Sequence, residues 1–386
     1  MNTVVLGDIA TWGSGGTPSR SVREYFGSGL PWVSIADLDD GPIGSAKESL
    51  TPLGIQNSSA KPVPPGTLLV AMYGSIGKLG ISTRELCTSQ AIAFAIPDKS
   101  RVDTRYLFHY LLAQRPRLQA FGRGGTQSNI GQGDLKSWRM PLPPVPEQRR
   151  IAEILDQADA LRAKRRAALA QLDTLTQSIF LDMFGDPVLN PRGLPIQKMI
   201  DLVDAERPIS YGILMPGPDQ EAGVKYVRVV DMQDGGIELS GIRQTTAAIS
   251  NAYRRSLLKS GDLLMSIRGH VGRLAVVPPA LDKANITQDT ARLAIAGAEP
   301  VFVRECLRTT GFQRWMARHT KGVAVRGINL GDVKLMPVIT PQLSEQKAFV
   351  RLAGAADELK IAARATLSEL GELFASLQHR AFRGEL

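Results

Sequence analysis

Residues 141–148 read Pro-Leu-Pro-Pro-Val-Pro-Glu-Gln, and a charged, leucine-rich stretch follows them. The dipeptide Glu147-Gln148 recurs 198 residues later as Glu345-Gln346, again at the head of a charged, leucine-rich stretch. Since 198 is about half of 386 residues, the chain contains an internal repeat of two units.

The stretch after each Glu-Gln pair has the periodicity of a coiled-coil helix. Apolar residues step by three and four, which is the a/d spacing of a row that packs against another helix. We therefore predict two long helices, residues 147–185 and 344–386, that pair antiparallel and act as a spacer. About 35 helical residues would span about 50 Å. The predicted row comprises Ile151, Ile154, Ala158, Leu161, Ala168, Leu172, Leu175 and Ile179, matched by Phe349, Leu352, Ala356, Leu359, Thr366, Leu370, Leu373 and Leu377. Arg165 and its counterpart Ala363 fill the remaining a position, and only the change from Ala168 to Thr366 loses apolar character.

The segments before the helices also repeat, with short β-like runs broken by glycine and proline. Residues 1–146 and 186–343 each read as a mixed domain, and each includes a helix-like stretch, Asp103 to about Leu118 and Val301 to Arg318. We predict an α+β (mixed α/β) fold with two repeated domains related by an approximate two-fold axis.

The prolines between Pro141 and Pro146 predict a stiff extended connector, with the first long helix beginning directly after it. Gly185 suits the C-terminus of that helix.

The composition favours a polyanionic partner. Lys and Arg number 46 against 37 Asp and Glu, a formal charge of +9, which suits nucleic acid or an acidic protein surface. Cys87 and Cys306 have no metal-ligand spacing and do not occupy matching places in the repeat, so no disulfide framework or zinc site is expected. With no apolar run of membrane-spanning length and no targeting signal, we expect a cytoplasmic protein without a membrane partner.

Taken together, the chain resembles the specificity subunit of a type I restriction-modification enzyme. The resemblance covers nearly the whole chain, and its most specific part is the Pro-rich connector followed by Glu-Gln and an amphipathic helix. The second half departs from the pattern, because Met336–Gln342 lacks the full Pro-Leu-Pro-Pro run and no Gly-Thr-Pro motif opens it. The segments that carry the resemblance are Gly15–Ser19, Leu30–Val33, Tyr73–Lys78 and Met140–Gln148.

The resemblance implies that each mixed domain is a target recognition domain that reads one half of a split, asymmetric sequence in double-stranded DNA. The helices would set the gap between the half-sites and bind two modification (methyltransferase) subunits. The chain itself would have no catalysis and no cofactor. The modification subunits would bind S-adenosylmethionine and methylate adenine, while a separate restriction (motor) subunit would use ATP and Mg to cleave DNA.

Two features of the repeat nominate residues that contact DNA. The loop Arg123–Asn129 aligns with Lys321–Gly327, and both are rich in glycine and in side chains that can bond phosphates or base edges. Basic residues also follow the matched turns Gly74–Gly77 and Gly269–Gly272. A solvated surface turn accounts equally for these loop residues, and the glycines alone explain the tight turns. The candidates are Arg20, Lys78, Arg123, Thr126, Gln127, Ser128, Asn129, Arg228, Arg268, Arg273, Lys321 and Arg326.

Enzymatic alternatives find little support in the residues. No Asp/Asn-Pro-Pro-Tyr tetrapeptide of an amino-methyltransferase occurs, and the four histidines are scattered, so neither catalytic nor metal-binding residues are nominated. Asp134 and Asp332 open matching Asp-x-Lys triplets, as in some nucleases, but packing or helix capping at the domain exit explains them better. An alternative from another class is a coiled-coil adaptor, or an inactive paralogue, without DNA specificity. Steeply salt-dependent, sequence-selective duplex binding would distinguish the two.

Overall fold

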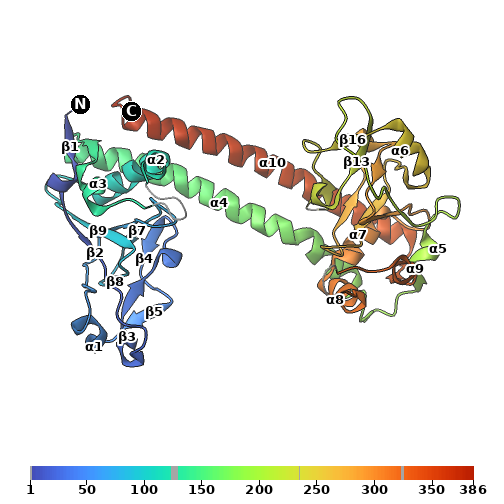
Figure 1. The fold of residues 1–386 in the computed structure, drawn as a ribbon, viewed down its shortest axis with the longest axis horizontal. Helices are drawn as coiled ribbons and strands as arrows, with labels where there is room; N and C mark the ends of the chain where they lie inside the picture. The colour runs from blue at the N-terminus through green and yellow to red at the C-terminus, as the bar shows by residue number, and fades with distance from the viewer. Residues whose placement is uncertain (1, 123–128, 234, 323–325) are drawn as a thin grey trace. The chain divides into compact units, whose positions relative to one another are not determined.

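The computed structural model describes residues 2–122, 129–233, 235–322 and 326–386 (Figure 1). The chain divides into unit 1, Met1–Arg166 with Ala365–Leu386, and unit 2, Ala167–Arg364. Two long helices, α4 (Val145–Phe184) and α10 (Leu343–Ala381), each begin in one unit and end in the other. Each unit therefore holds part of both helices.

Unit 1 contains a five-stranded sheet of order β2-β9-β6-β7-β4, a three-stranded sheet of order β5-β3-β8, and the pair β1-β10. Its strands are β1 (Thr3–Val5), β2 (Ala10–Ser14), β3 (Phe26–Val33), β4 (Gly41–Ile43), β5 (Glu48–Leu50), β6 (Leu68–Ala71), β7 (Leu79–Ser82), β8 (Cys87–Thr88), β9 (Ile92–Pro97) and β10 (Arg139–Pro141). Its helices are α1 (Pro52–Gln56), α2 (Thr104–Phe121) and α3 (Gln132–Ser137), with 3₁₀ turns at Leu6–Asp8, Arg23–Tyr25 and Ile35–Asp37.

Strand β6 is buried on both faces and separates two cores. Leu68 and Val70 point into the core shared with α2, α4 and the end of α10. Leu69 and Ala71 point into a second core, which includes Phe94. This explains why β6 reads as a continuous apolar run, since alternation of apolar and polar residues marks a strand buried on one face only.

Unit 2 repeats these parts with a four-stranded sheet of order β12-β20-β17-β18, a three-stranded sheet of order β16-β13-β19, and the pairs β11-β21 and β14-β15. Its strands are β11 (Ile196–Lys198), β12 (Ser210–Tyr211), β13 (Val224–Val227), β14 (Met232–Gln233), β15 (Gly236–Ile237), β16 (Arg243–Thr245), β17 (Leu263–Ser266), β18 (Leu274–Val276), β19 (Asn285–Ile286), β20 (Thr290–Leu293) and β21 (Pro337–Ile339). Its helices are α5 (Met199–Leu202), α6 (Ala247–Ala252), α7 (Pro300–Arg308), α8 (Thr310–His319) and α9 (Leu330–Lys334), with 3₁₀ turns at Val229–Asp231, Arg254–Ser256 and Pro279–Leu281.

The two units have the same connectivity around their small sheets. Strand β3 is antiparallel to β5 and parallel to β8, and β13 is likewise antiparallel to β16 and parallel to β19. In the larger sheets, β6 lies between β9 and β7, as β17 lies between β20 and β18. The predicted α+β fold and its internal repeat are confirmed, while the two-fold axis stays a prediction.

Within each unit, α4 and α10 run antiparallel. In unit 1, Arg150 of α4 donates to the carbonyl of Leu386 at 2.8 Å, and Arg162 lies 4.4 Å from the ring centroid of Phe374. From the first contact to the second, the residue number rises by twelve along α4 and falls by twelve along the C-terminal segment. In unit 2, Asp173 of α4 lies near Lys360 and Phe180 of α4 contacts Phe349, so the two helices again run in opposite directions. The predicted antiparallel pairing is confirmed.

The row of residues that packs between the helices differs from the predicted one. Most of the predicted positions are buried or half-buried, as Ile151 and Ala356 are, but several of the leucines face outward. The residue that follows such a leucine can fill the interface instead, as Phe374 does beneath Arg162. The apolar stripe is wider than the row that one partner helix can cover. We call Leu161, Leu175, Leu359 and Leu373, which are 54%, 36%, 57% and 52% exposed, the outward leucines.

The glutamine of each Glu-Gln pair is a buried connector. The Gln148 amide accepts from the Asp103 backbone N–H at 2.8 Å and donates to the carbonyls of Arg101 and Pro143 at 2.9 and 2.8 Å. Gln346 accepts from the Glu299 N–H at 3.0 Å and donates to the Pro341 carbonyl at 2.9 Å. Asp103 and Glu299 are the N-cap residues of α2 and α7. Each glutamine therefore ties the start of a long helix to the start of the helix beside it.

Two helix boundaries differ from expectation. Helix α4 begins at Val145, so Pro146 lies in its first turn, where a missing N–H costs nothing. The helix predicted from Val301 to Arg318 is two helices, because Thr309 leaves helical geometry and its side chain accepts from the Phe312 N–H as the N-cap of α8. Gly185 ends α4 with a φ of 76°, as predicted.

Candidate nucleic-acid interface

In unit 2, the turn Gly269–Gly272 joins β17 to β18 and needs glycine at both ends. The φ angles are 69° at Gly269 and 91° at Gly272, values that residues with a Cβ rarely adopt. A Cβ on Gly272 would also lie 2.8 Å from the Gln313 side-chain oxygen. The Gln313 amide instead donates to the Gly272 carbonyl at 3.1 Å, which fixes the turn against α8.

Four of the predicted residues gather around this turn. Arg268 forms a β-bridge with Gly327, and the Arg326 carbonyl accepts from the Gly269 N–H at 2.9 Å. Lys321 pairs with Gly327 through two backbone hydrogen bonds. The side chains of Arg268, Arg273, Lys321 and Arg326 are all exposed. The fold thus brings basic residues that are far apart in sequence to one edge of the sheet.

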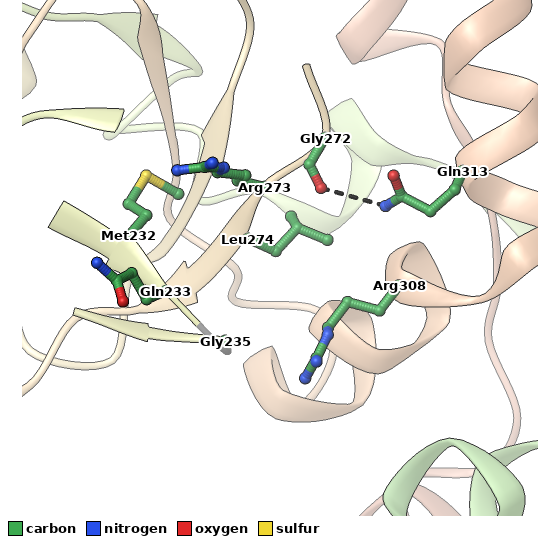
Figure 2. Close-up of a pocket in the computed structure, with 8 residues that line it drawn as sticks. All are labelled: Met232, Gln233, Gly235, Gly272, Arg273, Leu274, Arg308 and Gln313. Atoms are coloured by element: carbon green, nitrogen blue, oxygen red, sulfur yellow. Dashed lines mark hydrogen bonds between the residues drawn. The ribbon is translucent and has the colours of Figure 1, made fainter. Parts of the chain in front are cut away.

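Two clefts of about 500 Å³ each flank the turn. The one in Figure 2 lies between the β14–β15 hairpin, β18 and α7, and Arg273 and Arg308 contribute guanidinium groups to it. The second is lined by Val271, Thr320 and Arg326, and both clefts include Gln313. Guanidinium and amide donors at a concave surface can bond phosphates or base edges.

Arg308 and Gln313 are site residues that the sequence did not nominate. They come from α7 and α8, and Gln313 lies 41 residues beyond Gly272, the residue it holds. Gln313 lies inside a helix and not in either of the matched glycine turns, so only the fold identifies it.

Arg228 has a structural partner that limits its role as a contact residue. Its guanidinium bonds Asp231 at 2.7 and 3.1 Å and the Gly241 carbonyl at 2.9 Å. The hydrogen bond to Asp231 raises the pKa of Arg228. In unit 1, the hydroxyl of Ser34 donates to Asp37 at 2.6 Å in the equivalent turn. Both side chains therefore brace the same 3₁₀ turn in the two units.

The equivalent turn of unit 1 is Gly74–Gly77. Tyr73 forms a β-bridge with the exposed Asn129, as Arg268 does with Gly327. Lys78 is half-buried, and its ammonium group lies 3.5 Å from the Ile35 carbonyl. Arg273 reaches the matching carbonyl, that of Val229, at 3.3 Å. The predicted residues Arg123, Thr126, Gln127 and Ser128 lie outside the described residues.

Arg20 is not part of either cluster around the turns. It forms a two-pronged ion pair with Glu48 at 2.5 and 2.9 Å and lies over the rings of Phe26 and Trp32, 4.7 and 5.0 Å from their centroids. These contacts hold it against β3 and β5.

Asp134 caps a helix, as predicted, because its carboxylate accepts from the Gly131 N–H at 2.9 Å at the start of α3. The cap of α9 is Asn329, whose side chain accepts from the Asp332 N–H at 2.8 Å. Across the described part of the chain, no group of three or more His, Cys, Asp or Glu is placed to hold a metal ion. No described helix combines the length and the apolar character that crossing a membrane requires.

Comparison with known proteins shows which proteins this chain is similar to. Residues 1–171 match the model of the type I restriction modification DNA specificity domain. Over 389 residues, covering 93% of this chain and 80% of the relative, the chain is 27% identical to the Escherichia coli type I restriction enzyme EcoBI specificity subunit. It is 21% identical to the EcoKI specificity subunit of Escherichia coli K12, with 92% and 82% of the two chains covered.

The chain is therefore similar to type I restriction-modification specificity subunits along nearly its whole length. Its fold is also that of solved members. The S subunit of the type I restriction-modification system from M. genitalium superposes with a TM-score of 0.57 at 14% identity, over 99% of this chain and 96% of that one. A chain from a structure of type I R-M complex assembly and conformational transition gives 0.64 at 18% identity, covering 100% and 98%.

Proposed function

We propose that this specificity subunit directs a type I restriction-modification complex to a bipartite, asymmetric DNA site, with one unit reading each half-site. The observation that carries the proposal is that the two units share one connectivity but differ in the side chains at matching exposed turns. Lys78 stands where unit 2 has Arg273, and Asn129 where it has Gly327. One scaffold with two sets of exposed groups suits two different short sequences.

The long helices suit the role of a spacer. At 1.5 Å per residue, the 40 residues of α4 and the 39 of α10 are each about 60 Å long. Regular helices paired along their length resist bending more than a loop would, so their length would set the number of base pairs between half-sites.

The outward leucines support docking of two modification subunits. Leu161 and Leu373 belong to unit 1, and Leu359 and Leu175 are their counterparts in unit 2. The antiparallel register brings the two leucines of each pair to nearly the same level of the helices. Two matched apolar surfaces fit two copies of one partner, whose own apolar helix would cover them.

Chemistry would come from the partners. We propose that this chain is non-catalytic, that the modification subunits bind S-adenosylmethionine, and that the restriction subunit uses ATP and Mg. The complex would act on chromosomal and incoming DNA in the cytoplasm. The basic character of the chain, +9 overall, supports the DNA role.

The test is to produce the chain with the modification subunit encoded beside its gene and to map methyladenine across the host genome. Methylation confined to one split motif, and lost when this chain is deleted, is the expected result. An unchanged methylation pattern would refute the proposal and favour the adaptor or the inactive paralogue.

A further inference from the structure

Unit 2 has a third and larger cleft, of about 980 Å³, near the start of β17. It lies toward the opposite end of that strand from the Gly269–Gly272 turn, so it is separate from the interface described above. Its lining is strongly cationic, and we call it the basic pocket. The cations are Arg207, Arg254, Arg255, Lys259, Lys283 and Arg292.

Arg292 lacks a counter-ion although it is buried, with 3% of its surface exposed. Two of its nitrogens donate to the carbonyls of Leu257 and Pro208 at 3.0 and 2.9 Å, and its Nε has no hydrogen-bond partner. Among the described residues, no carboxylate lies within ion-pair distance of it. Burial, followed by the nearby charge of Arg207, lowers the pKa of Arg292, and the charges of Asp262 and Asp204 offset this only in part. A buried charge without an ion-pair partner is costly, so an anion in the pocket would be stabilising.

Of the other cations, only Arg207 is paired with a carboxylate of the described residues. Asp262 is engaged by both terminal nitrogens of Arg207, at 2.8 and 2.6 Å, and by the Lys259 N–H. Asp282 accepts from the Ser260 N–H at 3.2 Å, and Glu206 is exposed. The exposed side chains of Arg254, Arg255, Lys259 and Lys283 have no partner among the described residues. The pocket therefore carries surplus positive charge.

The matching place in unit 1 is apolar. Arg292 pairs with Leu264 of β17, and Phe94 pairs with Leu69 of β6 at the equivalent position of the ladder. Phe94 belongs to the apolar core that also contains Leu69. The repeat thus replaces a core aromatic ring by a buried guanidinium in one unit, which packing alone does not require.

We propose that the basic pocket of unit 2 is a phosphate-binding site that unit 1 lacks. Arginine and lysine donors around a cleft match the acceptor oxygens of a phosphate group. The phosphate could belong to the backbone of the bound duplex or to a small molecule in solution, and the first source rests on the proposed DNA-binding function.

The first experiment measures pyrophosphate binding to the full chain by titration calorimetry at low salt. The double variant Arg255→Ala/Lys259→Ala removes two exposed cations without touching the core. The variant Arg292→Phe installs the side chain that unit 1 uses at the same ladder position. Lys61→Ala/Lys99→Ala, which removes two exposed lysines of unit 1, is the matched control. We expect the wild type and the control to bind alike and both pocket variants to lose at least tenfold in affinity.

The second experiment distinguishes the source of the phosphate by measuring duplex affinity against salt concentration with the same variants. If the pocket holds the DNA backbone, the negative slope of log affinity against log salt should become shallower by about 2 in Arg255→Ala/Lys259→Ala. If the ligand is a small phosphate, pyrophosphate binding falls and the slope does not change. A wild type that binds pyrophosphate but no duplex would count against the DNA function and not against the pocket. No pyrophosphate binding by the wild type, or equal binding by both pocket variants, would overturn the inference.

Discussion

Replacing Gln148 by leucine tests whether the glutamine of the Glu-Gln pair holds the long helix to its unit. The substitution keeps a side chain of similar size but removes the amide. Three hydrogen bonds are lost, to the Asp103 N–H and to the carbonyls of Arg101 and Pro143. Each is worth about 1 kcal/mol net, so the free energy of unfolding should fall by about 3 kcal/mol. The same change at Gln346 removes two bonds and should cost about 2 kcal/mol.

The neighbouring glutamate supplies the control. Glu147 forms an exposed ion pair with Arg150, three residues along the same helix, and such pairs contribute about 0–1 kcal/mol. Glu147→Gln should therefore have a small effect. Equilibrium urea unfolding can be followed by tryptophan fluorescence, because unit 1 contains Trp12, Trp32 and Trp138 while unit 2 contains Trp315. If Gln148→Leu destabilises no more than Glu147→Gln, the glutamine is not the connector that its contacts indicate.

Three further outcomes are expected. Leu161→Glu/Leu373→Glu should reduce the number of modification subunits bound from two to one, as should the reciprocal pair Leu175→Glu/Leu359→Glu; mass measurement of the complex checks this, and unchanged stoichiometry with both pairs would argue against docking there. Deleting residues 164–170 together with their partners 366–372 shortens each helix by about 10 Å and should shorten the methylated motif's spacer by about three base pairs, whereas an unchanged spacer would refute the ruler role. Burial alone would raise the pKa of Asp156, but the hydrogen bond and charge of His109, with Arg105, keep this pKa below its ordinary value. The ionised carboxylate therefore stabilises the fold above about pH 4, and this stabilisation is lost as pH falls through the lower folded pKa. Asp156→Asn should thus flatten the acid loss of stability in urea unfolding, and an equally steep loss would show that another carboxylate is responsible.

The repeat and the long helices were predictable because they depend on local patterns. Gly185 and Asp134 act within a few residues of their own positions, and the sequence indicated both correctly. The break at Thr309 was missed because a threonine inside an apolar-periodic stretch gives no sign that its side chain will cap the next helix.

The orientation of the leucines and the composition of the clefts depend on tertiary packing. The apolar stripe of α10 contains both Leu373 and Phe374, and spacing alone does not choose which of them packs against α4. Gln313 and Arg292 reach their sites only through pairing of distant strands and helices. Contacts at such separations leave no periodic signal in one sequence.

The outward leucines also bear on how the chain survives in the cell before assembly. These leucines would be exposed to solvent on a chain without partners, and exposed apolar surface of this kind favours self-association. An excess of this chain over its partners should therefore precipitate or be degraded. Copies that have not bound their partners would then be removed by their own poor solubility.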